Sequence, residues 1–422
     1  MGEKKIMGAN GVPIYFYPCE GAHGFFISLF LKSGSMYEDE GEGGITHFLE
    51  HVAIRNVNHI FSGELYAMLD EYGLEFNAST YSEMVQFYVS GASKSFSRAA
   101  DIICRLLCPI ELGKDEIDLE RGRIRAEIRE ADERASLAGF TAEKVWEGTS
   151  LSRPITGTPK TVASITRKRL EEYRRRTFTK DNLFFYITGN VCEEEIKKFA
   201  AQLADFPVGV GQRHGNLAPI PRDFGRRGGR IEVKNADFTK VRFTFDLDMT
   251  RLSVPEVDLI YEIVLGGYNS DFFIELSEKR GLFYDLSGAT ERYLNVGTFS
   301  FSYELREAKL YEAVAMTVEL LSQLKSRVLP EKKCMKAGYV DNAYMLLDDV
   351  RELNFTLGYD NHVLELGYAN IDARIAKYRE VTPERILTAA SEIFRKDNLT
   401  LTVKGCKKRI DIKKLDGILS AL

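Results

Sequence analysis

The 422-residue sequence contains no apolar run that could span a membrane. Its longest apolar run, from Gly24 to Leu31, is ended by Lys32 and falls far short of the roughly 20 residues that a membrane helix needs. The opening segment, MGEKKIMGANGVPIYFYP, includes two lysines but no apolar stretch of the secretory type. We therefore expect neither a membrane partner nor secretion.

Paired cysteines and an excess of positive charge are also missing. The six cysteines are scattered without a C-x-x-C pair, which favours reduced thiols and a cytoplasmic location. Cys104 and Cys108 share one face of a predicted helix, where isoleucine and leucine neighbours favour apolar packing over metal binding. The net charge is −5, so nothing in the composition points to a nucleic-acid partner.

The chain does contain an internal repeat. Residues 165–191 and 381–407 share threonine, arginine, phenylalanine and glycine positions around the tetrapeptide Lys-Asp-Asn-Leu, at a constant offset of 216 without a gap. Each copy predicts a helix capped by a threonine, Thr166 or Thr382, and then a strand that ends at glycine. The repeat indicates that the two halves arose by duplication.

The fold class follows from this repeat and from the other strand-like segments. Runs rich in β-branched and aromatic residues predict strands at residues 12–18, 25–34, 229–235 and 240–249. A segment rich in glycine, proline and arginine, residues 207–229, predicts a linker. We predict an α+β protein with homologous domains at residues 1–206 and 230–422, each a largely antiparallel sheet with helices on one face.

The stretch GGITHFLEHVAIRN, residues 43–56, places three groups that are costly to bury in an apolar segment. On a helix capped by Thr46, His47 and His51 lie one turn apart and Glu50 lies on the same side. This H-x-x-E-H pattern directs two imidazoles and a carboxylate to one region, and zinc takes such ligands at ~2.0–2.2 Å. A single buried histidine is usually a hydrogen-bonded core residue, but a pair at this spacing with a glutamate favours metal.

A catalytic zinc needs a third protein ligand. The long charged helix predicted at residues 113–135 offers four candidates, which are Glu116, Glu120, Glu127 and Glu130. Glu120 and Glu127 are seven residues apart and face nearly the same way, so one could bind the metal while the other orients a histidine. A solvated helix face explains the same charges, and the spacing alone does not choose among the four.

The chain resembles the M16 metallopeptidases, the pitrilysin group that includes insulin-degrading enzyme and the mitochondrial processing peptidase. Residues 31–51, LKSGSMYEDEGEGGITHFLEH, are similar to the family's strand, Gly-Ser and H-x-x-E-H block. The family's third ligand is a glutamate about 75 residues beyond the second histidine, with another glutamate seven residues earlier. The resemblance therefore implies that Zn²⁺ is held by His47, His51 and Glu127, with Glu120 supporting a histidine.

Two further segments resemble the family's substrate-binding parts. Residues 76–91 are similar to the edge strand that holds the substrate, and Asn77 and Ala78 match its Asn-Ala. Residues 265–288 resemble a block in the second half that carries an arginine and, seven residues later, a tyrosine. Tyr284 stands at the tyrosine position, but Ser277 replaces the arginine.

The resemblance implies a zinc-dependent endopeptidase that hydrolyses unfolded peptides, with Glu50 as general base and Tyr284 as a second catalytic residue. The second domain would then serve substrate gripping and assembly. Ser277 implies a heterodimer in which a paralogous subunit supplies the missing arginine, and a homodimer that uses Tyr284 is the other possibility. Two rival interpretations are a non-catalytic assembly subunit of an M16-like complex and a zinc hydrolase of small amides.

Overall fold

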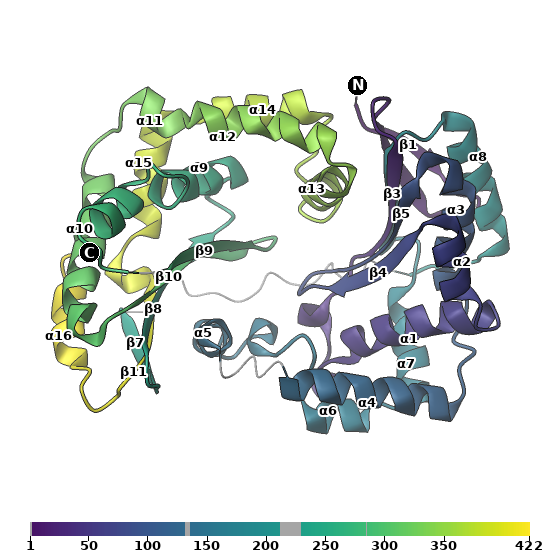
Figure 1. Cartoon of the computed structure of the whole chain (residues 1–422), viewed down its shortest axis with the longest axis horizontal. Coiled ribbons are helices and arrows are strands. Elements are labelled where there is room, and N and C mark those ends of the chain that lie inside the picture. Colours follow the sequence, from purple (N-terminus) through teal and green to yellow (C-terminus); the bar gives the residue numbers. More distant parts are fainter. Residues whose placement is uncertain (1, 131–135, 212–228, 284) are drawn as a thin grey trace. The chain divides into compact units, whose positions relative to one another are not determined.

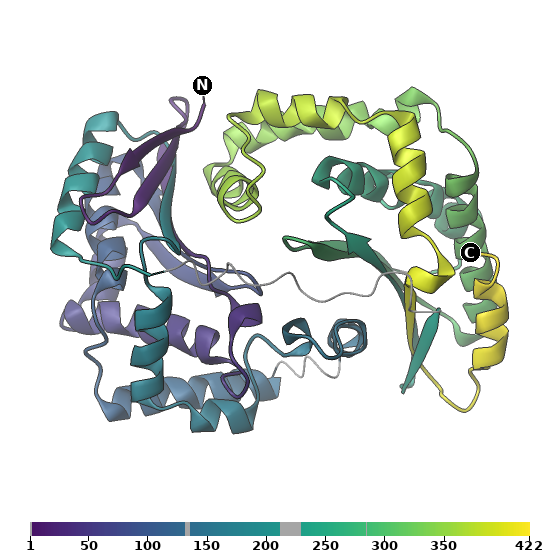
Figure 2. The same cartoon turned by 180° about the vertical axis from the view of Figure 1, so that it is seen from behind.

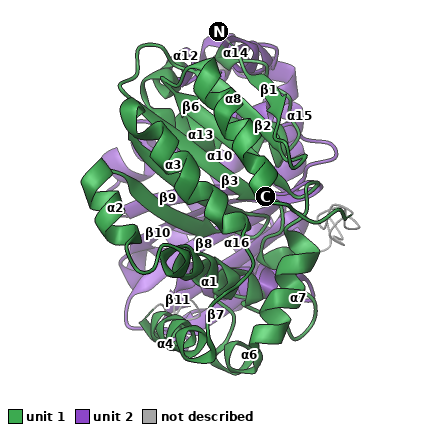
Figure 3. Cartoon of the chain, turned by 90° about the vertical axis from the view of Figure 1, so that its right-hand side faces the viewer, with its two compact units in different colours: residues 1–132, 153–218, 344–371 green, residues 133–152, 219–343, 372–422 purple. Residues whose placement is uncertain are grey.

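The computed structural model describes residues 2–130, 136–211, 229–283 and 285–422 (Figure 1). Two compact units divide the chain, as coloured in Figure 3. Unit 1 comprises Met1–Asp132, Arg153–Ala218 and Tyr344–Ile371, and unit 2 comprises Glu133–Ser152, Pro219–Ala343 and Asp372–Leu422. Each half of the chain therefore gives one segment to the unit formed mainly by the other half. Most of the predicted linker, residues 212–228, lies outside the described residues.

Unit 1 is built on a six-stranded sheet. Its strands are β1 (Lys4–Met7), β2 (Pro13–Pro18), β3 (Gly24–Leu31), β4 (Glu75–Thr80), β5 (Val85–Ala92) and β6 (Leu183–Gly189). They lie in the order β1-β2-β6-β3-β5-β4, and all neighbours are antiparallel except β2 and β6. β4 forms one edge of the sheet, and its outer side pairs with no other strand among the described residues.

One face of this sheet is apolar and packs against helices of the first half. Alternate strand residues such as Ile27, Leu29 and Phe185 are fully buried there. Cys104 belongs to the same core and confirms the prediction of apolar packing. The first-half helices of unit 1 are α1 (Ile45–Ile60), α2 (Leu65–Tyr72), α3 (Phe96–Cys104), α4 (Lys114–Glu130), α6 (Pro159–Ser164), α7 (Arg167–Thr177) and α8 (Glu193–Gln202).

The opposite face carries polar side chains and is covered by α13 (Val350–His362), which comes from the second half of the chain. Figures 1 and 2 show α13 on one side of the sheet and α3 and α8 on the other. Asn354 of α13 donates hydrogen bonds to the carbonyl oxygens of Phe26 and Tyr186 at 3.1 and 2.9 Å. The Ser28 hydroxyl donates to the Asn354 amide oxygen at 2.6 Å, so the buried polar groups of this face find partners on α13.

Unit 2 repeats the plan with five strands. They are β7 (Arg230–Asn235), β8 (Thr239–Asp248), β9 (Asp285–Arg292), β10 (Val296–Leu305) and β11 (Leu399–Gly405). Their order is β7-β11-β8-β10-β9, and only β7 and β11 are parallel. The second-half helices of unit 2 are α9 (Val254–Val264), α10 (Leu310–Ser326), α11 (Glu331–Met335), α12 (Ala337–Asn342), α14 (Ile371–Arg379), α15 (Pro383–Ile393) and α16 (Ile412–Leu419).

The helix that unit 2 receives from the first half is α5 (Leu137–Val145), which packs on β11 and β8. The hydroxyls of Thr141 on α5 and Thr402 on β11 lie 2.6 Å apart, on the polar face of this second sheet. Shifted by the repeat offset of 216, residues 137–145 fall on residues 353–361, which lie within α13. The two exchanged helices are therefore equivalent members of the repeat.

The structure confirms the α+β fold of two homologous domains and its repeat, and it adds α13 and α5 on the second face of the two sheets, which the prediction of helices on one face did not include. Thr166 and Thr382 cap α7 and α15 by accepting hydrogen bonds from the backbone N–H groups of Arg169 and Arg385. The strands β6 and β11 both begin at the leucine of Lys-Asp-Asn-Leu and end at glycine. Each sheet is largely antiparallel and has one parallel pair at the same place in the repeat. No helix of the described ranges is both long and apolar enough to cross a membrane.

Candidate active site

Helix α1 carries His47, Glu50 and His51, and its first turn is set by glycine. The helix begins at Ile45 after Gly44, whose φ of +88° lies in the left-handed region. A Cβ atom on Gly44 would lie 2.6 Å from the carbonyl oxygen of Thr156, so this close approach of two backbones needs glycine. The predicted cap at Thr46 is wrong, because Thr46 already lies inside the helix.

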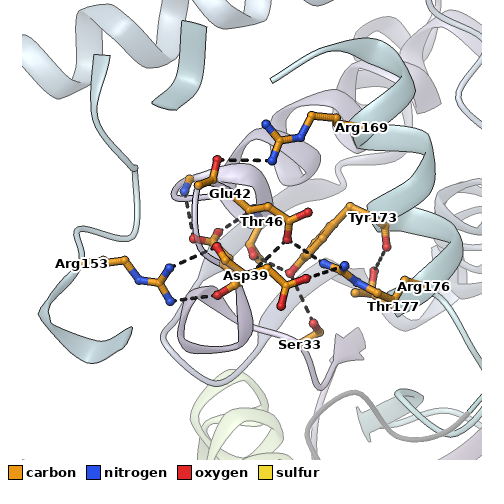
Figure 4. Close-up of polar contacts among 12 residues, drawn as sticks. Ser33, Asp39, Glu42, Thr46, Arg153, Arg169, Tyr173, Arg176 and Thr177 are labelled. Atoms are coloured by element: carbon orange, nitrogen blue, oxygen red, sulfur yellow. Dashed lines mark hydrogen bonds and ion pairs between the residues drawn. The ribbon is translucent and has the colours of Figure 1, made fainter. Parts of the chain in front are cut away.

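The exposed N–H groups at the start of α1 are instead capped by Glu38. Its two carboxylate oxygens accept hydrogen bonds from the backbone N–H groups of Gly44 and Thr46, both at 2.9 Å. The Thr46 hydroxyl is left to pair with the hydroxyl of Tyr173 on α7, 2.7 Å away (Figure 4). Glu38 is 4% exposed, and this burial raises its pKa to about 7 although the two N–H donors act in the opposite direction.

Two arginines hold the loop that contains Glu38. Arg153 donates to the carbonyl oxygens of Glu38 and Asp39 at 2.9 and 3.2 Å. Arg176 of α7 pairs with the carboxylates of Asp39 and Glu42 at 2.8 and 2.7 Å, as Figure 4 shows. The loop is thus attached to the rest of unit 1 at several points, and through Glu38 it fixes the start of the helix that carries the histidines.

The side chains of His47, His51 and Glu127 converge between α1 and α4. Nε2 of His47 lies 3.6 Å from one carboxylate oxygen of Glu127, and Nε2 of His51 lies 3.6 Å from the other. One ligand atom from each of the three residues lies within 4.8 Å of the other two. A tetrahedral zinc with bonds of ~2.0–2.2 Å keeps its ligands ~3.3–3.6 Å apart, so this donor set fits a zinc ion.

The two histidines differ in protonation. Burial, assisted by the nearby His51, lowers the pKa of His47 to about 3, so its imidazole is neutral near pH 7 as a metal ligand must be. Burial also lowers the pKa of His51, but its hydrogen bond to Glu120 and the charges of Glu50 and Glu127 outweigh this and raise the pKa overall. The acidic groups around His51 therefore make this a site that attracts positive charge.

Glu120 fixes the ring of His51. Its carboxylate is 2% exposed and lies 3.4 Å from Nδ1 of His51, which leaves Nε2 to face Glu127. Arg55 and Arg123 donate to the other oxygen of Glu120 at 3.2 and 2.9 Å. Burial raises the pKa of Glu120, but the bond to His51 and the two arginines lower it below its ordinary value, so the carboxylate stays ionised.

The other glutamates of α4 take different places. The carboxylate of Glu116 lies 3.3 Å from Nδ1 of His59, which is about two helical turns beyond His51 on α1. Within the described part of the chain, Glu130 does not belong to the group of side chains that could hold a metal ion. Of the four candidates on this helix, only Glu127 faces both histidines of the motif and only Glu120 touches the far side of His51.

Glu50 lies beside this group and is held by a strand. It is 8% exposed and accepts a short hydrogen bond from the hydroxyl of Thr80, the last residue of β4. Burial raises the pKa of Glu50, and the Thr80 bond only partly offsets this. Glu50 is therefore a buried carboxylate with a raised pKa beside a group that could hold a metal ion, an arrangement common at functional sites. Sequence reasoning missed Thr80, because nothing in its neighbourhood links it to Glu50.

The remaining candidates are two residues of β4 and two positions in the second half of the chain. Asn77 and Ala78 lie in the middle of the edge strand β4, where Asn77 pairs with Tyr88 of β5. Tyr284 lies outside the described residues. Ser277 lies in unit 2, in a π-helical segment spanning Phe273–Glu278. The structure therefore brings together His47, Glu50, His51, Glu120 and Glu127 within unit 1.

Comparison with known proteins identifies the family. The family model described as insulinase, peptidase family M16, matches residues 21–159, and the model described as peptidase M16 inactive domain matches residues 164–336. An uncharacterized zinc protease of Rickettsia bellii is 28% identical over 323 residues, covering 75% of this chain and 76% of that protein. An uncharacterized zinc protease of Streptomyces coelicolor is 24% identical over 384 residues, covering 87% of this chain and 82% of that protein.

Other relatives extend this result. The beta subunit of the rat mitochondrial-processing peptidase is 29% identical over 176 residues, which cover 41% of this chain and 36% of that subunit. The crystal structure of a protease from Helicobacter pylori superposes with a TM-score of 0.82 at 16% identity, covering 96% of this chain and 99% of the other. That likeness shows a shared fold, and together with the two family models it leads to one conclusion. The chain belongs to peptidase family M16.

Proposed function

We propose that this chain is a zinc-dependent endopeptidase that hydrolyses unfolded peptides. The observation that carries the proposal is the convergence of His47, His51 and Glu127 on one point beside the buried Glu50. Two bacterial relatives carry the name zinc protease, and this supports zinc as the metal. Two imidazoles and one carboxylate leave a fourth position for water or substrate, as catalytic zinc sites require.

In this proposal His47, His51 and Glu127 hold the zinc ion. When bound, zinc supplies Lewis acidity, which acidifies a water molecule and polarises a peptide carbonyl. Glu50 accepts the proton of the attacking water and later delivers it to the leaving amine. Its raised pKa favours this role, because a base works best when its pKa approaches the operating pH. Thr80 holds the Glu50 carboxylate in place, and Glu120 holds the ring of His51.

The edge strand β4 supplies the substrate-binding part of the proposal. An extended peptide can pair with the free side of β4 through backbone hydrogen bonds, which largely ignore the peptide's sequence. Asn77 and Ala78 lie two or three positions before Thr80, so a peptide bound along them passes next to Glu50. An unfolded peptide offers such a backbone along its whole length, which is why we propose unfolded peptides as substrates.

Ser277 and the relationship to a peptidase subunit lead us to include a partner. We propose a heterodimer in which a paralogous M16 subunit supplies the arginine that Ser277 replaces, while Tyr284 donates a hydrogen bond to the oxyanion of the tetrahedral intermediate. The alternative assembly is a homodimer, which has Ser277 in both copies and uses Tyr284 without the arginine. Ser277 also favours a second candidate function, a non-catalytic assembly subunit, since a chain without the arginine depends on another subunit for this contact.

The decisive experiment compares the native chain with Glu50→Gln and with the matched control Glu64→Gln. Glu64 is exposed, so the control removes a carboxylate away from the site. We expect about one zinc per chain in all three proteins and a loss of peptide cleavage of at least ~100-fold in Glu50→Gln alone. Zinc is measured by plasma emission and cleavage with a quenched peptide, with and without the paralogous subunit. A zinc-loaded chain that cleaves nothing in either condition would establish the assembly role.

A further inference from the structure

The exchanged helix α13 brings residues of the second half to the edge strand of unit 1. Strand residues alternate between faces, so Thr80, which meets Glu50 of α1, lies on the opposite side from Glu75 and Asn77. The register places Asn77 beside Tyr88 and Tyr88 beside Ser28, whose hydroxyl bonds to Asn354 of α13. The face of β4 that carries Glu75 and Asn77 is therefore the α13 face.

Successive turns of α13 reach successive points along β4. Arg351 donates to the carboxylate of Glu75 at 2.6 Å, near the start of the strand. One turn later, the ring of Phe355 lies 5.6 Å from the ring of Tyr81, the residue that follows the strand. Another turn later, Tyr359 stacks on Phe355 with 5.8 Å between ring centroids. Tyr81, Phe355 and Tyr359 thus form an aromatic cluster between the end of β4 and α13.

Tyr81 joins this cluster to the candidate active site. It follows Thr80 directly, and the hydroxyl of Thr80 binds the carboxylate of Glu50. Burial raises the pKa of the Tyr81 hydroxyl against a hydrogen bond with Ser79 that lowers it, and the charges of Glu352 and Glu50 add to the rise. Tyr81 is nevertheless 37% exposed, and Phe355 is partly exposed. An accessible aromatic surface therefore lies next to Thr80, whose hydroxyl binds the proposed general base.

We propose that Tyr81 and Phe355 form a specificity subsite that receives a large apolar or aromatic side chain of the peptide substrate. The inference rests on the proposed function, since it needs an extended peptide on the free edge of β4. Such a peptide points alternate side chains to the α1 side and to the α13 side, with a rise of ~3.3 Å per residue. The side chain that meets Tyr81 then lies within about two residues of the bond that Glu50 helps to break.

The charged groups around Tyr81 and Phe355 indicate which substrate side chain would bind there. At the start of the strand, Arg351 and Glu75 form an ion pair, so little net charge is left there to interact with a substrate. Near the aromatic pair, Glu352 contributes negative charge and the carboxylate of Glu83 is bound by the Tyr359 hydroxyl. Aromatic rings in this position gain from stacking and from leaving water, whereas an acidic side chain would meet like charge. We therefore expect aromatic over small residues, and small over acidic ones.

The test uses peptides of about twelve residues that differ only by Phe, Ala or Asp at each position within two residues of the cleaved bond. Cleavage by the native chain is compared with Tyr81→Ala, Phe355→Ala and Phe355→Leu. Tyr66→Ala is the matched control, because Tyr66 is an exposed tyrosine of α2 in the same unit and 58% exposed. Binding of the same labelled peptides to Glu50→Gln chains, with and without Phe355→Ala, is measured by fluorescence anisotropy, which needs no turnover.

At one position we expect kcat/KM for the Phe peptide to exceed that for the Ala peptide by about 10- to 100-fold in the native chain and in Tyr66→Ala. In Tyr81→Ala and Phe355→Ala this ratio should fall below about threefold, with an intermediate value in Phe355→Leu. A ratio that survives in both alanine variants overturns the subsite and leaves the peptidase intact. If Phe355→Ala lowers zinc content or helicity, Phe355→Leu decides instead: an intermediate ratio supports the subsite, and an unchanged ratio overturns it.

The binding arm separates this inference from the proposed function. A native chain that cleaves no peptide with or without the paralogous subunit, beside a Glu50→Gln chain that binds the Phe peptide more tightly only when Phe355 is present, supports the subsite and overturns the peptidase. Equal binding of the Phe, Ala and Asp peptides by both chains overturns the subsite whatever the cleavage result. Cleavage with the expected loss of preference supports both.

Discussion

The cap on α1 allows a quantitative prediction for Glu38→Gln. The Glu38 carboxylate accepts two backbone hydrogen bonds, from Gly44 and Thr46, and is nearly enclosed by protein. Replacing it with an amide keeps the shape but turns an NH₂ group toward one of the two N–H donors, so one bond is lost. Loss of one buried hydrogen bond costs ~1–3 kcal/mol at any pH. The variant also removes the ionisation of the group.

That ionisation makes the difference between the two proteins depend on pH. Burial raises the folded-state pKa of Glu38 from an ordinary 4.5 to about 7. Below pH 4.5 Glu38 is protonated in both the folded and the unfolded state, so its contribution to the free energy of unfolding has its full value there. Between pH 4.5 and 7 the folded state keeps a proton that the unfolded state releases, so the free energy of unfolding falls as pH rises. At 1.36 kcal/mol per pH unit, the loss approaches ~3 kcal/mol above pH 7.

We expect Glu38→Gln to be less stable than the native chain at pH 5 and to approach or exceed its stability at pH 8. Urea unfolding of the metal-free proteins, followed by far-ultraviolet circular dichroism at four pH values, gives the difference between variant and native chain. Groups shared by the two proteins cancel in that difference. The single tryptophan, Trp146, belongs to unit 2, so its fluorescence reports that unit separately.

Glu40→Gln is the matched control, because Glu40 lies in the same loop but is exposed. Its difference from the native chain should not change with pH by more than a few tenths of a kcal/mol. A constant difference for Glu38→Gln would show that Glu38 has an ordinary pKa. A difference that grows with pH would show that the ionised carboxylate is the favoured form, and either result would refute the reasoning.

Three further predictions concern the metal group and the exchanged helix. Glu127→Gln should strip zinc from the chain at micromolar chelator while Glu130→Gln does not, as measured by metal analysis; the reverse result would move the third ligand. Glu120→Gln should weaken zinc binding by about 10- to 100-fold in a competition titration, because His51 loses the partner that orients its ring. Asn354→Ala should lower the free energy of unfolding by ~2–4 kcal/mol in urea titrations, since several buried groups lose their partner at once.

Much of the candidate site was predictable because its signal is local. His47, Glu50 and His51 fall on one side of one helix through their spacing, and helix geometry then places them together without further information. The choice of Glu127 needed more than spacing, because four glutamates on the same helix looked alike. The family resemblance made that choice, and the structure places Glu127 opposite both histidines.

The features that the sequence did not reveal depend on contacts between distant residues. Glu38 caps α1 across a loop rather than from the position next to the helix, so the threonine that matches the local rule was chosen instead. Thr80 meets Glu50, and Phe355 meets Tyr81 from the other half of the chain. No local pattern encodes such pairs.

The exchange of α5 and α13 gives a physical reason why the two repeats remain in one chain. Each sheet buries polar residues on its second face, among them Ser28 in unit 1 and Thr402 in unit 2. Buried hydroxyls and carbonyls are costly unless they find partners, and here the partners are Asn354 and Thr141, which come from the opposite half. A single repeat alone would leave its polar face without these partners. Because α13 also brings Phe355 beside Tyr81, the second half contributes to unit 1 directly, and under the proposed subsite a change in the second half would alter substrate choice without touching His47, His51 or Glu127.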